Sequence, residues 1–182
     1  MDINFLVNMT SRAWVLPILA SFHEGVPGRQ AALLKATGAS RSAFAQSMQH
    51  MIQSGLVERN PGHGHPLRPE FRLTASGAQV AAMAGRLQTL PDRDDLALLR
   101  RTWTLPVLTS LRQPRHFSEI RGFLPGITDR ALSQSLNLLE EKEWVMRDIQ
   151  HEARPPRPIY SAINAGAMIS HATVPEVSLH TG

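Results

Sequence analysis

The chain of 182 residues contains no cysteine. This absence excludes disulfide bonds, thiolate metal sites and cysteine-based redox switching. Aromatic residues are scarce, at 5%, with a single tyrosine. No apolar run approaches the roughly 18 residues that a membrane-spanning helix needs, and residues 1–8 lack the basic start of a secretion signal. Together these absences predict a cytoplasmic protein that has no membrane partner.

Common catalytic motifs are absent as well. The sequence has no glycine-rich phosphate loop, no Gly-x-Ser-x-Gly turn and no His-Glu-x-x-His pair. His63 and His65 have a spacing that metal sites use, but no carboxylate or further histidine clusters with them. We therefore expect no catalysis, no cofactor and no metal.

Lysine is almost missing, because arginine supplies 17 of the 19 basic residues. Residues 1–89 hold eight basic and four acidic residues, whereas the rest of the chain holds eleven of each. A basic, arginine-rich first half favours a polyanionic partner such as a nucleic acid. The alternative from charge alone is an ordinary solubility charge, since the net charge is only +4.

The chain contains one pattern twice. The strongest matches pair residues 12–21 with 101–110, at a spacing of 89, and residues 38–47 with 126–135, at a spacing of 88. A period this long is typical of two copies of one small domain rather than of a solenoid. We expect copy one at residues 1–90, copy two at 91–172 and a flexible tail at 173–182.

Helical periodicity and turn residues predict the same element order in both copies. In copy one we expect helices at 9–23, 29–37, 41–54 and 75–90, with Ser40 as an N-cap, and strands at 56–59 and 70–74 around a loop at 60–69. In copy two we expect helices at 92–111, 118–123, 129–142 and after Asn164, strands at 144–148 and 159–162, and a loop at 149–158. Ser118 and Thr128 are the expected N-caps.

Three helices followed by a two-stranded hairpin form the plan of a winged helix-turn-helix. The predicted fold class is mainly α with small β-hairpins (α+β), as two tandem winged helix-turn-helix domains that form a pseudo-two-fold pair.

Copy two resembles the HxlR-type winged-helix transcriptional regulators in an ordered series of motifs. These are Trp103 to Leu108, His116 to Ile120, Pro125 to Thr128, Leu132 to Glu140, and Ala153 to Ser161. Copy one is similar more loosely. The resemblance implies a DNA-binding regulator, with two departures. Family members usually carry one such domain and dimerise, and many carry a cysteine that some use as a sensor, so thiol sensing does not carry over.

The third helix of each copy has an apolar and a polar face. The apolar stripes, expected in the core, are Phe44, Met48 and Met51, and Leu132, Leu136 and Leu139. The opposite faces carry Ser42, Gln46, Gln49 and Gln53, and Arg130, Gln134, Asn137 and Glu141. Amide and guanidinium groups can read base edges in the major groove. The alternative is a polar face that is merely solvated.

The hairpin loops carry basic side chains that suit phosphate or minor-groove contacts. The full set of expected DNA-contacting residues is Arg41, Ser42, Gln46, Gln49, His63, His65, Arg68, Thr128, Arg130, Ser133, Gln134, Asn137, Arg154 and Arg157.

These features predict a sequence-specific regulator that binds double-stranded DNA at an imperfect inverted repeat, associated with the nucleoid of a bacterial cytoplasm. RNA polymerase or another transcription factor stays open as a further partner. The oligomeric state also stays open, between a monomer with an internal pseudo-dimer and a homodimer. The alternative function is a tandem winged-helix scaffold for protein interactions, as in chromosome-segregation accessory proteins, or a co-regulator that binds DNA weakly.

Overall fold

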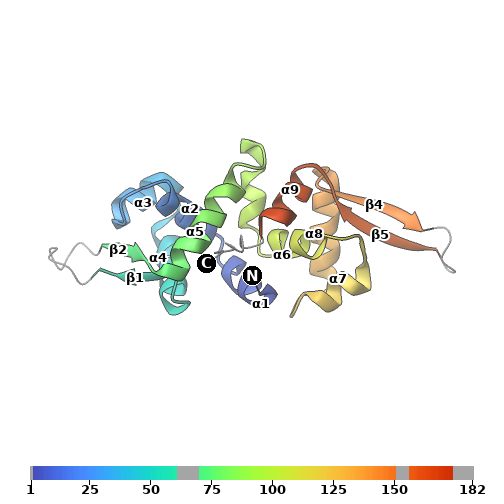
Figure 1. Ribbon diagram of the computed structural model, residues 1–182, viewed down its shortest axis with the longest axis horizontal. Coiled ribbons are helices and arrows are strands. Elements are labelled where there is room, and N and C mark those ends of the chain that lie inside the picture. The colour runs from blue at the N-terminus through green and yellow to red at the C-terminus, as the bar shows by residue number, and fades with distance from the viewer. Residues whose placement is uncertain (1, 61–69, 151–155, 174–182) are drawn as a thin grey trace, which may run out of the picture.

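The computed structural model of the chain describes residues 2–60, 70–150 and 156–173. Within these ranges the chain is mostly helical, with small antiparallel hairpins. Figure 1 shows two similar halves side by side, with a hairpin pointing outward at each end. The predicted fold class, mainly α with two tandem winged helix-turn-helix units, is confirmed.

The described residues of copy one form five helices and one hairpin. The helices are α1 (Ile3–Thr10), α2 (Val15–His23), α3 (Gln30–Thr37), α4 (Arg41–Gln53) and α5 (Ala75–Gln88). The hairpin pairs β1 (Val57–Arg59) with β2 (Phe71–Leu73) in antiparallel register, with Glu58 opposite Arg72.

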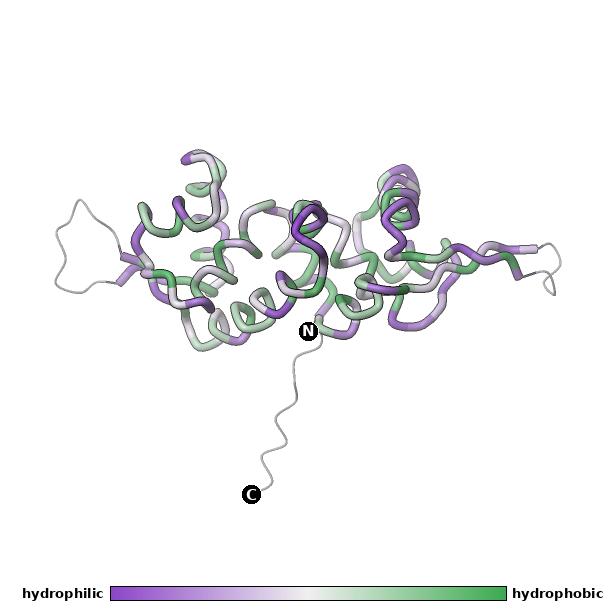
Figure 2. Tube along the Cα trace, turned by 90° about the horizontal axis from the view of Figure 1, so that it is seen from above, coloured by the Kyte–Doolittle hydropathy of each residue, from purple (hydrophilic) through white to green (hydrophobic). Residues whose placement is uncertain are grey.

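Copy two repeats this order with a larger sheet. Its helices are the 3-10 helix η1 (Arg93–Arg100), α6 (Thr104–Ser110), α7 (Phe117–Phe123), α8 (Asp129–Glu141) and α9 (Asn164–Ala172). Its strands are β3 (Arg115–His116), β4 (Val145–Gln150) and β5 (Arg157–Ala162), in the order β3-β5-β4. The two long strands β4 and β5 form a hairpin that projects from the end of the body, as seen from above in Figure 2.

The prediction of one long first helix in each copy is wrong. Residues 9–23 divide into α1 and α2, which are bent by 99°, and residues 92–111 divide into η1 and α6. The prolines explain both breaks. Pro17 and Pro106 lie in the first turns of α2 and α6, where a missing N–H costs nothing, whereas inside a longer helix each ring would clash with a carbonyl four residues earlier.

Two smaller predictions also need correction. Ser118 does not cap α7, because the helix already begins at Phe117 and the Glu119 carboxylate accepts the backbone N–H of His116 at 2.6 Å. The hairpin of copy two is longer than predicted, so Ile149, Gln150, Arg157 and Pro158 belong to strands rather than to the loop. Cross-strand pairing thus extends this hairpin, the wing of copy two, as far as Gln150 and Arg157.

The same backbone junction joins three elements in each copy. In copy one the N–H of Leu56 donates to the carbonyl of Met51 in α4 at 2.9 Å, and the carbonyl of Leu56 accepts the N–H of Thr74 at 3.0 Å. In copy two Trp144 takes the place of Leu56, donating to Leu139 at 2.8 Å and accepting from Ile163 at 2.9 Å. The third helix, the hairpin and the last helix of each copy therefore meet at the backbone of one residue, Leu56 or Trp144.

Close approach at this junction requires a glycine in the last helix. A Cβ added at Gly77 would lie 1.8 Å from the carbonyl oxygen of Leu56, and one added at Gly166 would lie 2.1 Å from that of Trp144. Neither helix could pack there with a side chain at that position. This explains why Gly77 and Gly166 occupy matching positions of the repeat.

The residue before the junction differs between the copies. Gly55 has a φ of 67°, in the left-handed region that follows many helices. Its counterpart Glu143 has a φ of 56°, which costs a residue with a side chain about 1 kcal/mol. The Asn164 side chain donates to the Glu143 carbonyl at 2.9 Å and helps to hold that conformation.

The first helix of each copy packs across the boundary between the copies. α1 contacts α6 of copy two as well as α2 of its own copy, and η1 contacts α2 of copy one as well as α6 of its own copy. α5 and α9 also meet, and the Arg100 guanidinium lies 4.5 Å from the ring centre of Trp14. Because Leu6, Met9, Leu98 and Leu99 are buried, this packing makes one continuous core.

No single helix in the described part of the chain is long and apolar enough to cross a membrane. α1 and α2 reach the required apolar length only as a bent pair, and most of their apolar side chains are buried in the core.

The junction generates a stability prediction. Gly77→Ala and Gly166→Ala should each lower the free energy of unfolding by about 1–3 kcal/mol, because a methyl group must displace backbone. Gly122→Ala is the control, since nothing lies within 4 Å of an added Cβ there, and it should be neutral or stabilising by about 0.5 kcal/mol. Urea unfolding measures all three variants. Equal effects at the three positions would contradict the proposed role of the junction.

Candidate nucleic-acid interface

Each copy contains a helix-turn-helix with a left-handed glycine in the turn. Gly38, with a φ of 71°, separates α3 from α4, and Gly126, with a φ of 78°, precedes α8. The hydroxyl of Ser40 accepts the Ala43 N–H at 3.3 Å, and that of Thr128 accepts the Ala131 N–H at 3.2 Å. The predicted N-caps of both third helices are therefore confirmed.

The apolar faces of α4 and α8 are buried as predicted. Phe44, Met48 and Met51 are at most 3% exposed, and Leu132, Leu136 and Leu139 at most 1%. Burial of three side chains at helical spacing fixes the rotation of each helix about its axis. The rotation in turn determines which side chains face solvent.

The polar faces of both helices are exposed as that rotation requires. All the predicted outward positions of the two helices lie at the surface, namely Arg41, Ser42, Gln46, Gln49 and Gln53 in α4, and Arg130, Ser133, Gln134, Asn137 and Glu141 in α8. Each copy thus presents a strip of amides, hydroxyls and one or more guanidiniums. Thr128 is also exposed, although its oxygen already serves the cap. Base contact by these residues stays a prediction.

Most of the predicted wing contacts lie outside the described residues. This applies to His63, His65, Arg68 and Arg154. Arg157 is described, and it is an exposed residue of β5 opposite Gln150 rather than a loop residue.

The described base of the copy-one wing is charge-paired. Arg72 donates to Glu58 across the hairpin at 2.5 Å, and Arg29 lies 3.6 Å from Glu70. All four side chains are exposed, so these pairs contribute little to stability. Arg59 at the end of β1 is also exposed, so the described base of this wing carries one positive charge more than these two pairs balance.

An ion pair at the start of α8 was not foreseen. Asp129, the first residue of the helix, pairs with Arg121 of α7. The pair compensates the one acidic charge at the N-terminal end of α8, which would otherwise repel phosphate. No sequence spacing pointed to it, because the pairing depends on how α7 and α8 pack.

The far ends of both third helices are tied to the first helix of their own copy. The His50 ring nitrogen Nε2 lies 3.0 Å from the Asn8 carbonyl oxygen, and the Lys142 ammonium donates to Asp95 at 2.6 Å. The hydrogen bond to the Asp95 carboxylate, together with its charge, raises the pKa of Lys142 above its usual value.

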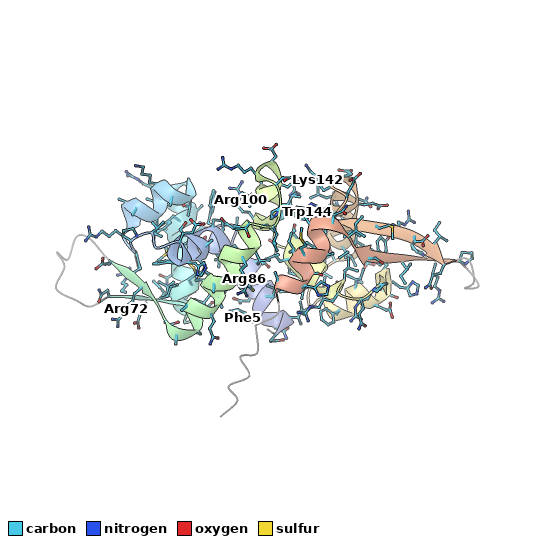
Figure 3. The ribbon with its side chains drawn as sticks, turned by 45° about the horizontal axis from the view of Figure 1, so that its top comes forward. Phe5, Arg72, Arg86, Arg100, Lys142 and Trp144 are labelled. Carbon is cyan, nitrogen blue, oxygen red and sulfur yellow. The ribbon has the colours of Figure 1, made fainter. Side chains whose placement is uncertain are left out.

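The tryptophans are structural in different ways. Trp144 is 3% exposed and lies at the end of α8 near Lys142, as Figure 3 shows. Trp14 and Trp103 are half-buried, pack against the core and immediately precede α2 and α6. Among the residues that the structure describes, no group of three His, Asp or Glu side chains could hold a metal.

Two helix-turn-helix units of matching geometry in one chain decide its classification. The model of the HxlR-like helix-turn-helix family matches residues 9–94 and again residues 98–175. The chain belongs to the HxlR-like helix-turn-helix family. The resemblance seen in the motifs, including the tandem duplication, is therefore confirmed.

The individual relatives match this chain over 81 residues, which is about the length of one copy. The uncharacterized HTH-type transcriptional regulator YtfH of Escherichia coli K12 is 32% identical over 81 residues. These residues are 44% of this chain and 64% of YtfH, so the chain spans less than two thirds of that relative. YtfH of Shigella flexneri gives the same values. No solved structure matches the chain.

The caps of the two third helices generate a second prediction. Ser40→Ala and Thr128→Ala should each lower the free energy of unfolding by about 1 kcal/mol, because each leaves a helix N–H without its partner. Ser133→Ala is the control, since this exposed serine lies inside α8. Thermal or urea unfolding distinguishes them. A Ser133→Ala loss as large as the cap losses would show that the hydroxyls do not act as caps.

Proposed function

We propose that the protein is a transcriptional regulator that binds double-stranded DNA with both copies. α4 and α8 would lie in the major groove, and the two wings on phosphates or in the minor groove. This proposal rests on the observation that both third helices expose a strip of amide, hydroxyl and guanidinium side chains while burying the opposite face. Family membership and the name of YtfH support this function.

The packing of the first helices across the boundary supports a pseudo-dimer within one chain. Simple winged-helix regulators present two recognition helices by pairing two chains, and here α1, η1, α5 and α9 hold two helix-turn-helix units in one body. Two recognition helices would then meet successive major grooves about 34 Å apart. We propose that the boundary between the two domains lies between residues 90 and 91. We also propose that a monomer binds DNA and that the protein is associated with the nucleoid.

The two copies should read different bases. The exposed strip of α4 has Arg41 at its start, whereas that of α8 starts with Asp129 and Arg130. Side chains at the start of a recognition helix make most base contacts. The operator is consequently an imperfect inverted repeat, with Gln46 and Gln49 at one half-site and Gln134 and Asn137 at the other.

A protein-interaction scaffold is the second candidate function. It is favoured by the equal numbers of basic and acidic residues after residue 89. RNA polymerase or another transcription factor would be the partner of such a scaffold or of a weakly binding co-regulator.

Salt dependence separates these functions. Genome-wide DNA pull-down with motif analysis identifies a site, and gel shifts then compare it with random DNA. A regulator should prefer the site by at least about a thousandfold at physiological salt, and its affinity should fall steeply as salt rises. Weak binding that is the same for every sequence would support the scaffold instead.

Paired variants test the unequal contributions of the copies. Arg41→Ala with Gln46→Ala should weaken binding to the site more than Arg130→Ala with Gln134→Ala, because copy one carries the net positive charge. Gln53→Ala, at the far end of the same face, is a matched control that should have little effect. Gel shifts on half-site mutants assign each copy to its half. Equal losses from the two pairs would reject the asymmetry.

A further inference from the structure

A groove lies on the seam where α1 of copy one meets copy two. It has a volume of about 520 Å³, and its walls come from the start of α1, the end of α6 with the residues that follow it, and the end of α7. Small-molecule sites in proteins typically occupy about 300–1,000 Å³ and often lie between domains. Figure 1 shows α1, near the label of the N-terminus, lying alongside α6.

The groove combines apolar surface with two guanidinium groups. Ile3 and Leu6 contribute the apolar wall on α1, and Phe123, 38% exposed, contributes the facing ring. Arg112 and Arg115 provide the positive charge. The guanidinium carbon of Arg115 lies 5.1 Å from the ring centre of Phe123, so charge and ring are adjacent.

Each of the two arginines is held in place by a hydrogen bond from its own Nε. The Arg112 Nε donates to the Ser170 carbonyl at 3.2 Å, and the Arg115 Nε donates to the Ser110 carbonyl at 2.7 Å. A guanidinium anchored through Nε keeps its two terminal nitrogens for a second partner. Such a fork matches the two oxygens of a carboxylate.

One acidic residue, Asp2, also borders the groove. Its carboxylate accepts the Asn4 backbone N–H at 3.3 Å as the cap of α1. The hydroxyls of Thr109 and Ser110 bond to Thr173 and to the Val107 carbonyl. Two positive charges against one leave the charge balance of the described lining in favour of an anion.

The matching seam in copy one has the opposite chemistry. At the spacing of 89 residues, Arg112 and Gln113 correspond to His23 and Glu24. Ile3 and Leu6 correspond to Asp92 and Asp95. Three of these four residues are acidic, and one of them, Asp95, is paired with Lys142. The other two carboxylates, of Glu24 and Asp92, would repel an anion. The two copies thus share the fold of the seam, while only one seam has the lining of an anion site.

We propose that this groove binds one small organic carboxylate with an apolar body per chain. The apolar body lies between Ile3, Leu6 and Phe123, and the carboxylate is bound by Arg112 and Arg115. The ligand bridges α1 to α7, the helix that precedes α8. Its effect on DNA affinity rests on the proposed function, whereas its binding does not.

Calorimetric titration of the full chain without DNA tests the proposal. The probes are benzoate and hexanoate, with benzamide as the uncharged analogue of benzoate. We expect one carboxylate bound per chain, and at least about tenfold weaker binding of benzamide, which corresponds to about 1.4 kcal/mol. This comparison needs no variant and so does not depend on folding.

Variants then place the site. Arg112→Gln should weaken benzoate about tenfold, and Phe123→Ala should weaken it while preserving the fold, because this ring is partly exposed. Glu24→Gln, in the matching seam of copy one, is the control and should leave binding unchanged. The proposal is overturned if neither carboxylate binds, if benzamide binds as well as benzoate, or if Arg112→Gln and Phe123→Ala bind like the unmodified chain. None of these outcomes depends on DNA binding.

Discussion

One peptide carbonyl in each copy holds the functional elements together. The carbonyl of Leu56, or of Trp144 in copy two, accepts the N–H of the N-cap residue of the last helix, and a glycine of that helix lies directly against it. The N–H of the same residue closes the end of the third helix. Recognition helix, wing and last helix are therefore joined through backbone atoms, and their mutual orientation does not depend on long side chains.

Because the junction is made of backbone atoms, the exposed side chains can differ between the copies while the arrangement of helices and strands stays the same. A side chain on the exposed strip of α4 or α8 can change without touching the hydrogen bonds that position the helix. The copies use this freedom differently. α4 starts with Arg41, whereas α8 starts with Asp129, whose charge is compensated by Arg121. The same holds at the seams, where Arg112 corresponds to His23, and Ile3 and Leu6 correspond to Asp92 and Asp95.

Packing of the first helices across the boundary joins the two copies into one body. α1 contacts α6 as well as α2, and η1 contacts α2 as well as α6, so each first helix packs on both copies. Two small domains thus become one larger core, which is more favourable for units of about 80–90 residues than two separate cores. The same packing places the seam groove between α1 and copy two.

Much of this organisation could be read from the residues alone. The repeat, the apolar stripes of α4 and α8, the caps Ser40 and Thr128, and the exposed strips all follow from spacing, because helical periodicity and cap chemistry are local properties. The breaks at residues 11–14 and 101–103 were also encoded locally, in Pro17 and Pro106, but the apolar periodicity running through them outweighed that signal.

The features that stayed hidden all join residues far apart in the chain. Four features depend on how complete helices pack. They are the pairing of Arg121 with Asp129, the contacts of α1 and η1 with both copies, the stacking of Arg100 on Trp14, and the groove between α1 and α6. Local spacing specifies which face of a helix is apolar, but several partners can cover such a face. The partner is selected only by the packing of the whole core, in which backbone contacts as close as that of Gly77 with Leu56 admit one arrangement.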